Sequence, residues 1–192
     1  MENKIVVVIP SLEPDSNFID YIKNIKEAGA DYMVIVDDGN KPIYKDLFKE
    51  VQEQGFIVLK HGVNCGKGRS YKTAFNYILC EMDDVDTIVT ADGDGTYLPD
   101  DIINVARNSK EGTITIGCRD FNDEKIGGST RHSNAVTSFL LKTLSDISMS
   151  DTQSSLRAFN RDLLPYMITV IGERYDYDFN MIFEKKNIVL QE

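Results

Sequence analysis

The residues with the clearest chemical meaning are two aspartates, Asp92 and Asp94, in the segment Ala91-Asp-Gly-Asp-Gly95. They follow residues 87–90, a short apolar run that is typical of a buried strand. Two carboxylates one residue apart on a turn can face one hard divalent cation, and glycines beside them let a ligand approach the backbone. The pattern predicts a Mg²⁺ or Mn²⁺ site at Asp92 and Asp94, suited to a substrate that carries a diphosphate.

Polar residues follow other apolar runs as well: Pro10, Ser11 and Glu13 after residues 5–9, Asp37 and Asp38 after residues 33–36, and Arg119 and Asp120 after residues 113–117. Ligands of an open parallel sheet bind at the carboxyl ends of its strands, so these residues are expected at one edge. Any one of them is equally consistent with a turn or a helix cap. Their recurrence after four runs favours a shared site.

The elements that must position these residues alternate along the chain. Strands are predicted over residues 5–9, 33–36, 56–60, 87–90 and 113–117, with helices from Asp15 or Ser16 to Gly29, over 42–54, from the glycine loop 62–68 to about Cys80, and over 99–108. The run at residues 5–9 is continuously β-branched, as in a strand buried on both faces. This alternation predicts right-handed βαβ crossovers and a mostly parallel sheet.

The last third of the chain has a different pattern. It predicts a polar loop over 121–131, a helix over 132–147, a polar segment over 148–155, a short apolar run at 156–159, a helix near 177–186 and a strand from Ile188. Without a repeat or a linker, we expect one domain over residues 1–192. Because the last strand has barely begun at Glu192, we expect the domain to continue beyond the C-terminal end of this sequence.

Composition limits the partners and the compartment. The formal net charge of −10 argues against a partner held through nucleic-acid phosphates. Three scattered cysteines and two histidines support neither a zinc site nor a disulfide framework, so a reducing cytoplasm fits best. No window reaches the roughly 18 apolar residues of a membrane helix. A peripheral contact with the inner face of the cell membrane remains compatible with the sequence.

One alternative arises from the same two aspartates. Asp92-Gly-Asp-Gly-Thr96 matches the signature of haloacid-dehalogenase-like phosphatases, with Asp92 as the nucleophile and Asp94 as the acid/base. That signature normally opens its fold, whereas three predicted strands precede it here. A second alternative is a non-catalytic domain that only binds a nucleotide sugar.

Six segments taken together resemble family 2 glycosyltransferases with the GT-A fold, in the branch of dolichyl- and polyprenyl-phosphate sugar synthases. They are Val8-Ile-Pro-Ser11, Val36-Asp-Asp-Gly39, Asn64-Cys-Gly-Lys-Gly68, Ala91-Asp-Gly-Asp-Gly95, Gly117-Cys-Arg119 and Asp151-Thr-Gln-Ser-Ser-Leu-Arg-Ala-Phe159. The acidic segment Gly172-Glu-Arg-Tyr-Asp-Tyr-Asp-Phe-Asn180 adds a further match. The resemblance implies a three-layer α/β/α sandwich around a mostly parallel central sheet.

The resemblance also implies roles for individual residues. Those assigned to nucleotide-sugar binding are Pro10, Ser11, Glu13, Asp37, Asp38, Lys67 and Asp92, with Asp38 recognising the base and Asp92 and Asp94 holding the metal and diphosphate. Lys67 lies between two glycines, which suits a contact to pyrophosphate or ribose, although a solvated loop lysine is the alternative.

The resemblance further implies that arginines at these motifs hold the phosphate of a lipid acceptor or the donor diphosphate, a task that a planar guanidinium matches, whereas the alternative is that they only pair with the many carboxylates. Arg119 and Arg131 are the candidates, whereas Arg157 lies in a predicted strand and is expected to be structural. Asp151 and Gln153, with the acidic pair Asp176 and Asp178, are candidates for a general base or for positioning the acceptor, and a cap or turn is the alternative for Asp151.

The expected reaction is metal-dependent, inverting transfer of a hexose from a UDP- or GDP-sugar to polyprenyl phosphate or a glycan, in cell-envelope glycan synthesis. Many synthases of the branch carry Asp-Ala-Asp-Gly-Gln-His where this chain has Gly93, Thr96 and Tyr97. Ser155 also replaces a usual glycine. These departures leave the donor sugar and the acceptor open.

Overall fold

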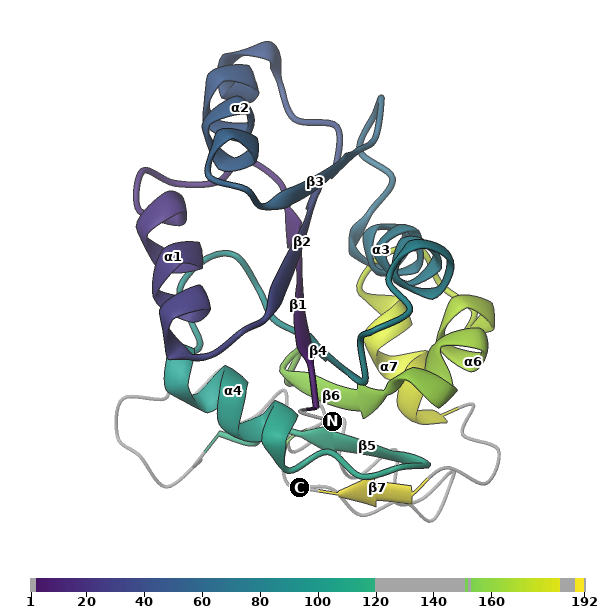
Figure 1. Ribbon diagram of the computed structural model, residues 1–192. Coiled ribbons are helices and arrows are strands. Elements are labelled where there is room, and N and C mark those ends of the chain that lie inside the picture. Colours follow the sequence, from purple (N-terminus) through teal and green to yellow (C-terminus); the bar gives the residue numbers. More distant parts are fainter. Residues whose placement is uncertain (1–2, 120–150, 152, 184–188, 192) are drawn as a thin grey trace.

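A seven-stranded sheet with the order β3-β2-β1-β4-β6-β5-β7 forms the centre of the computed structural model, which describes residues 3–119, 151, 153–183 and 189–191 (Figure 1). The strands are β1 (Ile5–Ser11), β2 (Tyr32–Asp37), β3 (Ile57–Lys60), β4 (Thr87–Thr90), β5 (Thr113–Ile116), β6 (Arg157–Asn160) and β7 (Val189–Gln191). The helices are α1 (Phe18–Ala28), α2 (Lys45–Glu53), α3 (Lys67–Glu81), α4 (Pro99–Arg107), α6 (Leu164–Thr169) and α7 (Asp176–Phe183), with 3₁₀ turns η1 (Pro42–Tyr44) and η2 (Arg161–Leu163).

The sheet is mostly parallel, as the sequence predicts. β1 pairs in parallel with β2 and β4, β2 with β3, and β5 with β7. β6 is antiparallel to both of its neighbours, with Val89 opposite Ala158 on β4 and Thr115 opposite Ala158 on β5. β6, which contains Arg157, Ala158 and Phe159 of the quoted motif, therefore lies between two strands that come much earlier in the chain.

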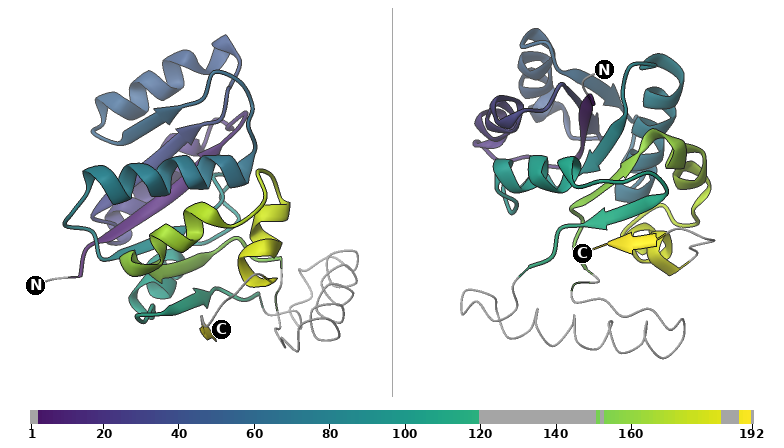
Figure 2. Two further views of the ribbon diagram at one scale, coloured as in Figure 1. Left: turned by 90° about the vertical axis from the view of Figure 1, so that its right-hand side faces the viewer. Right: turned by 60° about the horizontal axis from the view of Figure 1, so that its bottom comes forward.

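Helices cover both faces of the sheet, which confirms the three-layer arrangement. α1, α2 and α4 lie on one face, and α3, α6 and α7 lie on the other (Figures 1 and 2). Each face has its own apolar core: Phe18, Ile22 and Ile25 of α1 pack on the first, and Tyr71 and Phe75 of α3 on the second. Alternate residues of β1 point to opposite cores, so both faces of this strand are apolar.

β1 extends two residues beyond the predicted strand, through Pro10 to Ser11. Pairing with β4 ends at Val8 opposite Thr90, whereas pairing with β2 continues to Ser11 opposite Asp37. Beyond Val8 the strand thus has one neighbour, and Pro10 takes the place of an edge residue, where a missing N–H is tolerated.

Several boundaries differ from the predictions. Asn17, and neither Asp15 nor Ser16, occupies the N-cap of α1, and the Asp15 carboxylate instead accepts the Asn17 N–H at 2.8 Å. The short helix α6 was not predicted, because six residues are too few to show a helical period. The expected helix at 132–147, together with Arg131 and Asp120, lies outside the described residues.

Arg157 has the structural role expected of it. Its side chain is fully buried under α7, where Nε donates to the Ser154 carbonyl at 3.0 Å and Nη1 donates to the Asp178 carbonyl. Within the described parts of the chain, no helix combines the length and the apolar character needed to cross a membrane.

Candidate functional site

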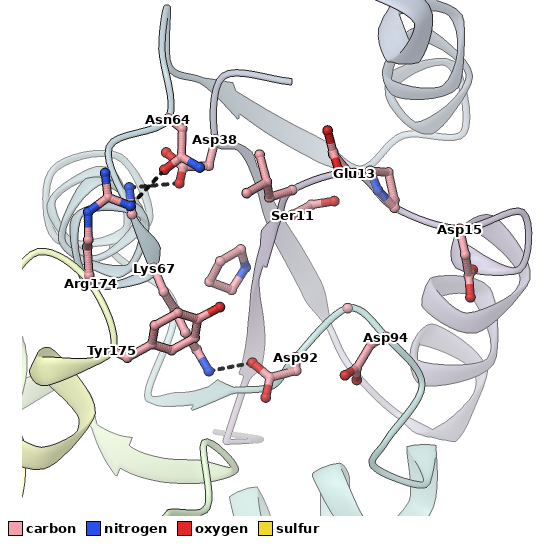
Figure 3. Close-up of a pocket in the computed structure, with 15 residues that line it drawn as sticks. Ser11, Glu13, Asp15, Asp38, Asn64, Lys67, Asp92, Asp94, Arg174 and Tyr175 are labelled. Carbon is pink, nitrogen blue, oxygen red and sulfur yellow. Dashed lines mark hydrogen bonds and ion pairs between the residues drawn. The ribbon is translucent and has the colours of Figure 1, made fainter. Parts of the chain in front are cut away.

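A pocket of about 430 Å³ lies at the carboxyl ends of β1, β2 and β4 (Figure 3). Seven residues singled out in the sequence line it: Pro10, Ser11, Glu13, Asp38, Lys67, Asp92 and Asp94. The structure thus brings together side chains from three strand ends and one helix start, as expected for an open parallel sheet. The Ser11 hydroxyl is buried in this wall and has no hydrogen-bond partner among the described residues.

Lys67, the first residue of α3, contacts the acidic turn directly. Its ammonium lies 2.5 Å from Asp92 Oδ1 and 3.4 Å from Asp178 Oδ2, and it donates to Ser155 Oγ at 2.5 Å. Burial lowers the pKa of Lys67, but the two carboxylates outweigh burial, so its pKa is raised and it stays protonated. Lys67 lines the pocket as expected, but its ammonium is an internal counterion that fixes Asp92 against α7, which also differs from the solvated loop lysine of the alternative.

Asp94 is the more exposed of the two aspartates, and its Oδ1 accepts the Thr96 N–H at 3.0 Å, which closes the turn. Among the described residues, Oδ2 of Asp92 and Oδ2 of Asp94 accept no hydrogen bond and make no ion pair. Two available carboxylate oxygens at the wall of a pocket are the donors that Mg²⁺ or Mn²⁺ prefers, so the residues present fit such an ion.

Asp38 is held rigidly at the other end of the pocket. Its Oδ1 accepts the Cys65 N–H at 2.9 Å and lies 2.7 Å from His61 Nδ1, and its Oδ2 accepts the Gly66 N–H at 2.8 Å. Burial raises the pKa of Asp38, but these hydrogen bonds more than offset it, so the pKa is lowered. The carboxylate is consequently ionised and fixed in orientation.

His61, Asp38 and Cys65 also form a group of potential metal ligands that sequence spacing did not reveal, with ligand atoms within 4.8 Å of one another. His61 Nε2 lies 2.9 Å from the Thr73 hydroxyl, so both ring nitrogens have partners. The contacts define a hydrogen-bond network that orients Asp38.

Asp37 is not among the residues that line the pocket. Its Oδ1 accepts the backbone N–H of Asn40 at 2.9 Å and the Asn40 side-chain amide at 2.8 Å. Asn40 in turn donates to the Ser11 carbonyl at 2.8 Å. Asp37 thus forms the turn after β2, which is the structural alternative for such a residue, and Asn40 links that turn to Ser11 of the pocket.

Arg119 and Asp151 form a pair of their own, and neither lines the pocket. Arg119 Nε and Nη2 lie 2.7 and 2.9 Å from the two oxygens of Asp151, which also accept the backbone N–H groups of Arg119 and Gln153. Burial raises the pKa of Asp151, but Arg119 outweighs burial and the pKa is lowered. A carboxylate paired in this way is a weak general base. Gln153 is exposed beside it.

Asp151→Asn is expected to reduce the free energy of unfolding at pH 7 by about 1–2 kcal/mol, because Arg119 loses a bidentate partner. Since the folded-state pKa of Asp151 lies below its ordinary value of 3.8, its stabilisation is present above that value and is lost as pH falls through the folded pKa. Urea unfolding of both proteins between pH 7 and pH 3 measures this difference. An equal difference at pH 3 would contradict the role assigned to the ionised carboxylate.

Other residues that line the pocket carry no predicted role in the site, among them Arg174 and Tyr175. Both precede α7 and lie on the wall opposite Asp94 (Figure 3). The segment that contains them, Gly172 to Asn180, matches an acidic motif of the family, and that motif predicts no role for the arginine. The signal in the sequence that could have indicated Arg174 is that it is a basic residue inside an otherwise acidic segment.

The fold and the pocket define an open α/β domain that takes its ligand at the carboxyl ends of the strands, beside an Asp-x-Asp turn. The chain belongs to glycosyl transferase family 2, whose model matches residues 6–166. The resemblance drawn from the motifs is thereby confirmed, and the haloacid-dehalogenase-like alternative is excluded by the family.

Two archaeal relatives match most of the chain. A UDP-N-acetylglucosamine–dolichyl-phosphate N-acetylglucosaminyltransferase of Methanococcus voltae is 28% identical over 211 residues, which cover 97% of this chain and 82% of the relative. An uncharacterised protein of Methanocaldococcus jannaschii is 27% identical over 199 residues, which cover 100% of this chain and 80% of that protein.

Among solved structures, the chain is similar to glucosyl-3-phosphoglycerate synthase from Mycobacterium tuberculosis. The complex with Mn²⁺, UDP and phosphoglyceric acid superposes with a TM-score of 0.71 at 18% identity, covering 99% of this chain and 68% of the synthase. The complex with Mn²⁺, UDP and glucosyl-3-phosphoglycerate gives a TM-score of 0.69, also at 18% identity, with 94% and 64% covered. The chain thus spans about two thirds of the synthase, and the likeness confirms the GT-A fold.

Proposed function

We propose that this chain is a metal-dependent, inverting glycosyltransferase that moves a hexose or N-acetylhexosamine from a nucleoside diphosphate sugar to polyprenyl phosphate. A glycan is the second candidate acceptor. The reaction would belong to cell-envelope glycan synthesis and take place in the cytoplasm, at the inner face of the membrane. The observation that carries the proposal is the position of Asp92 and Asp94 in one pocket with Ser11 and Asp38.

The arrangement of the residues that line the pocket suits a nucleoside diphosphate. Asp38 lies at one end with its carboxylate fixed by Cys65 and Gly66, and Asp94 lies toward the other (Figure 3). We assign the base to the Asp38 end and the diphosphate to the Asp94 end. Ser11, with a buried hydroxyl that lacks a partner, would donate to or accept from the nucleoside between them.

A Mg²⁺ or Mn²⁺ ion held by Asp92 and Asp94 would neutralise the charge that develops on the departing diphosphate. Lys67 keeps Asp92 oriented through its ion pair at 2.5 Å. The acceptor phosphate oxygen forms the new bond to the anomeric carbon on the face opposite the leaving group. The bond to the diphosphate breaks, and the nucleoside diphosphate leaves with the electron pair.

A phosphate acceptor is already anionic at pH 7, so the reaction needs no strong general base. This agrees with Asp151, whose pKa is lowered by Arg119 and whose oxygens are fully occupied. We assign Asp151 to positioning Arg119, and Arg119, with Arg131, to the acceptor phosphate. Gln153 would help to position the acceptor.

The experiment that tests the proposal has two stages. Calorimetry with UDP-N-acetylglucosamine, UDP-glucose and GDP-mannose, each with and without Mn²⁺, measures donor binding. Transfer of radiolabelled sugar from the bound donor to a short-chain polyprenyl phosphate in detergent then measures turnover. We expect metal-dependent binding of at least one donor, followed by transfer.

The outcomes separate the remaining alternatives. A wild-type protein that binds no donor in the presence of Mn²⁺ would contradict the proposal. Binding without transfer to polyprenyl phosphate or to a glycan acceptor would favour a domain that only binds nucleotide sugars. Transfer to a glycan alone would keep the reaction and replace the acceptor.

A further inference from the structure

The charges around the pocket are unbalanced for a ligand that carries a diphosphate. Five acidic side chains line it, Glu13, Asp15, Asp38, Asp92 and Asp94, against two cationic ones, Lys67 and Arg174. One bound divalent ion would offset the pair Asp92 and Asp94. A diphosphate therefore needs a further cationic contact, because an anion facing unpaired carboxylates is repelled.

Lys67 is poorly placed to be that contact. Its ammonium is shared among Asp92, Asp178 and Ser155, all within 3.4 Å, and only 12% of its side chain is exposed. The carboxylates of Asp92 and Asp178 already compensate its charge. A diphosphate that recruited Lys67 would have to separate it from a buried carboxylate, which is costly.

Arg174 has the opposite surroundings. Its Nη1 lies 3.4 Å from the Asn64 side-chain oxygen, a neutral acceptor, and it makes no ion pair with any carboxylate in the described part of the chain. Its guanidinium lies at the wall of the pocket beside Asn64, across from Asp94 (Figure 3). A guanidinium that has no anionic partner and faces a pocket can bind a phosphate with two parallel hydrogen bonds.

The backbone that carries Arg174 is fixed on the glycine loop. The carbonyl of Glu173 accepts the Arg69 N–H at 3.0 Å, in the first turn of α3. The contact is so close that a Cβ on Gly66 would lie 2.5 Å from this carbonyl oxygen. The Arg174 N–H donates to Asp176 Oδ1 at 2.9 Å. The backbone of Arg174 is therefore fixed before a ligand binds, so binding does not have to pay for ordering this turn.

From these contacts we infer that Arg174 binds the diphosphate of the donor, on the side of the pocket opposite the metal-binding aspartates. This inference rests on the proposed function, because it takes a nucleoside diphosphate sugar as the ligand. It identifies an anchor that recognises the phosphates themselves and that reaches them from beside Asn64, at the Asp38 end of the pocket, while Asp92 and Asp94 lie across from it (Figure 3).

The test compares UDP with uridine, by calorimetry on the whole chain in saturating Mn²⁺. Arg174→Gln is expected to weaken UDP binding about tenfold, the effect of losing a charge-assisted contact at a solvent-accessible site, and to change uridine binding less than about twofold. Arg174→Lys, which keeps the charge and loses the planar fork, is expected to recover part of the loss. The loss should shrink as salt rises.

Arg107→Gln is the matched control, because Arg107 is also exposed, lies in the last turn of α4 and does not line the pocket. It should bind UDP as the wild-type protein does. Wild-type affinity for UDP in Arg174→Gln, or an equal loss for UDP and uridine, would overturn the inference while leaving the proposed function intact. If the wild-type protein binds neither UDP nor GDP, the proposed function itself fails.

Discussion

Asp94→Asn is expected to weaken Mn²⁺-dependent binding of UDP at least about a hundredfold, the largest effect of any single side chain in the pocket. The reason is that a divalent ion at this site depends on two carboxylates and loses one of them. Asparagine keeps the side-chain oxygen that accepts the Thr96 N–H at 3.0 Å, so the turn itself should persist. Calorimetry with and without Mn²⁺ separates loss of the metal from loss of the nucleotide site.

The control for this substitution is Asp83→Asn, which removes an equal charge from a side chain that is 97% exposed and does not line the pocket. It should leave the UDP affinity unchanged. If Asp94→Asn binds UDP in Mn²⁺ as tightly as the wild-type protein does, the Asp-x-Asp segment is only a turn. Residual binding that no longer responds to Mn²⁺ is the result that we expect.

The parallel half of the fold could be predicted because its strands carry a local signal. Residues 5–9 are continuously β-branched and fully apolar, and the polar residues after each strand indicate the edge at which the site forms. For this reason Ser11, Asp38, Asp92 and Asp94 could be assigned to one site before their distances were known. Local patterns of this kind depend on strand and turn geometry alone.

The rest of the site depends on contacts between distant parts of the chain, which local patterns do not encode. In the sequence, Lys67 is 25 residues away from Asp92 and 111 residues away from Asp178. Its role as an internal counterion appears only when α7 packs on α3 and brings the three side chains together. The same holds for Arg174, which reaches the pocket because its turn contacts Gly66 and Gly68. β6 likewise inserts between strands from other parts of the chain.

Gly68 has the most demanding of these contacts. It is the second residue of α3 and is buried, and a Cβ there would lie 2.6 Å from Tyr177 Cβ and 2.9 Å from the Glu173 carbonyl carbon. Tyr177 cannot easily move, because its ring is fully buried and its hydroxyl donates to the Met167 carbonyl at 2.7 Å. The backbone of the turn that carries Arg174 would have to shift instead.

Gly68→Ala is therefore expected to reduce the free energy of unfolding by about 3 kcal/mol and to weaken UDP binding at the same time. The direction of the stability change separates the close contact from helix propensity, because propensity alone would make the alanine variant more stable than the wild type by about 1 kcal/mol. Urea unfolding followed by circular dichroism measures the change in the free energy of unfolding.

Gly62→Ala is the matched control, because a Cβ at Gly62 meets no atom within 4 Å, and its effect should stay within about 0.5 kcal/mol. A Gly68→Ala protein as stable as the wild type would mean that α7 and its turn do not pack on the glycine loop as closely as these contacts require, and the fixed position of Arg174 would lose its basis.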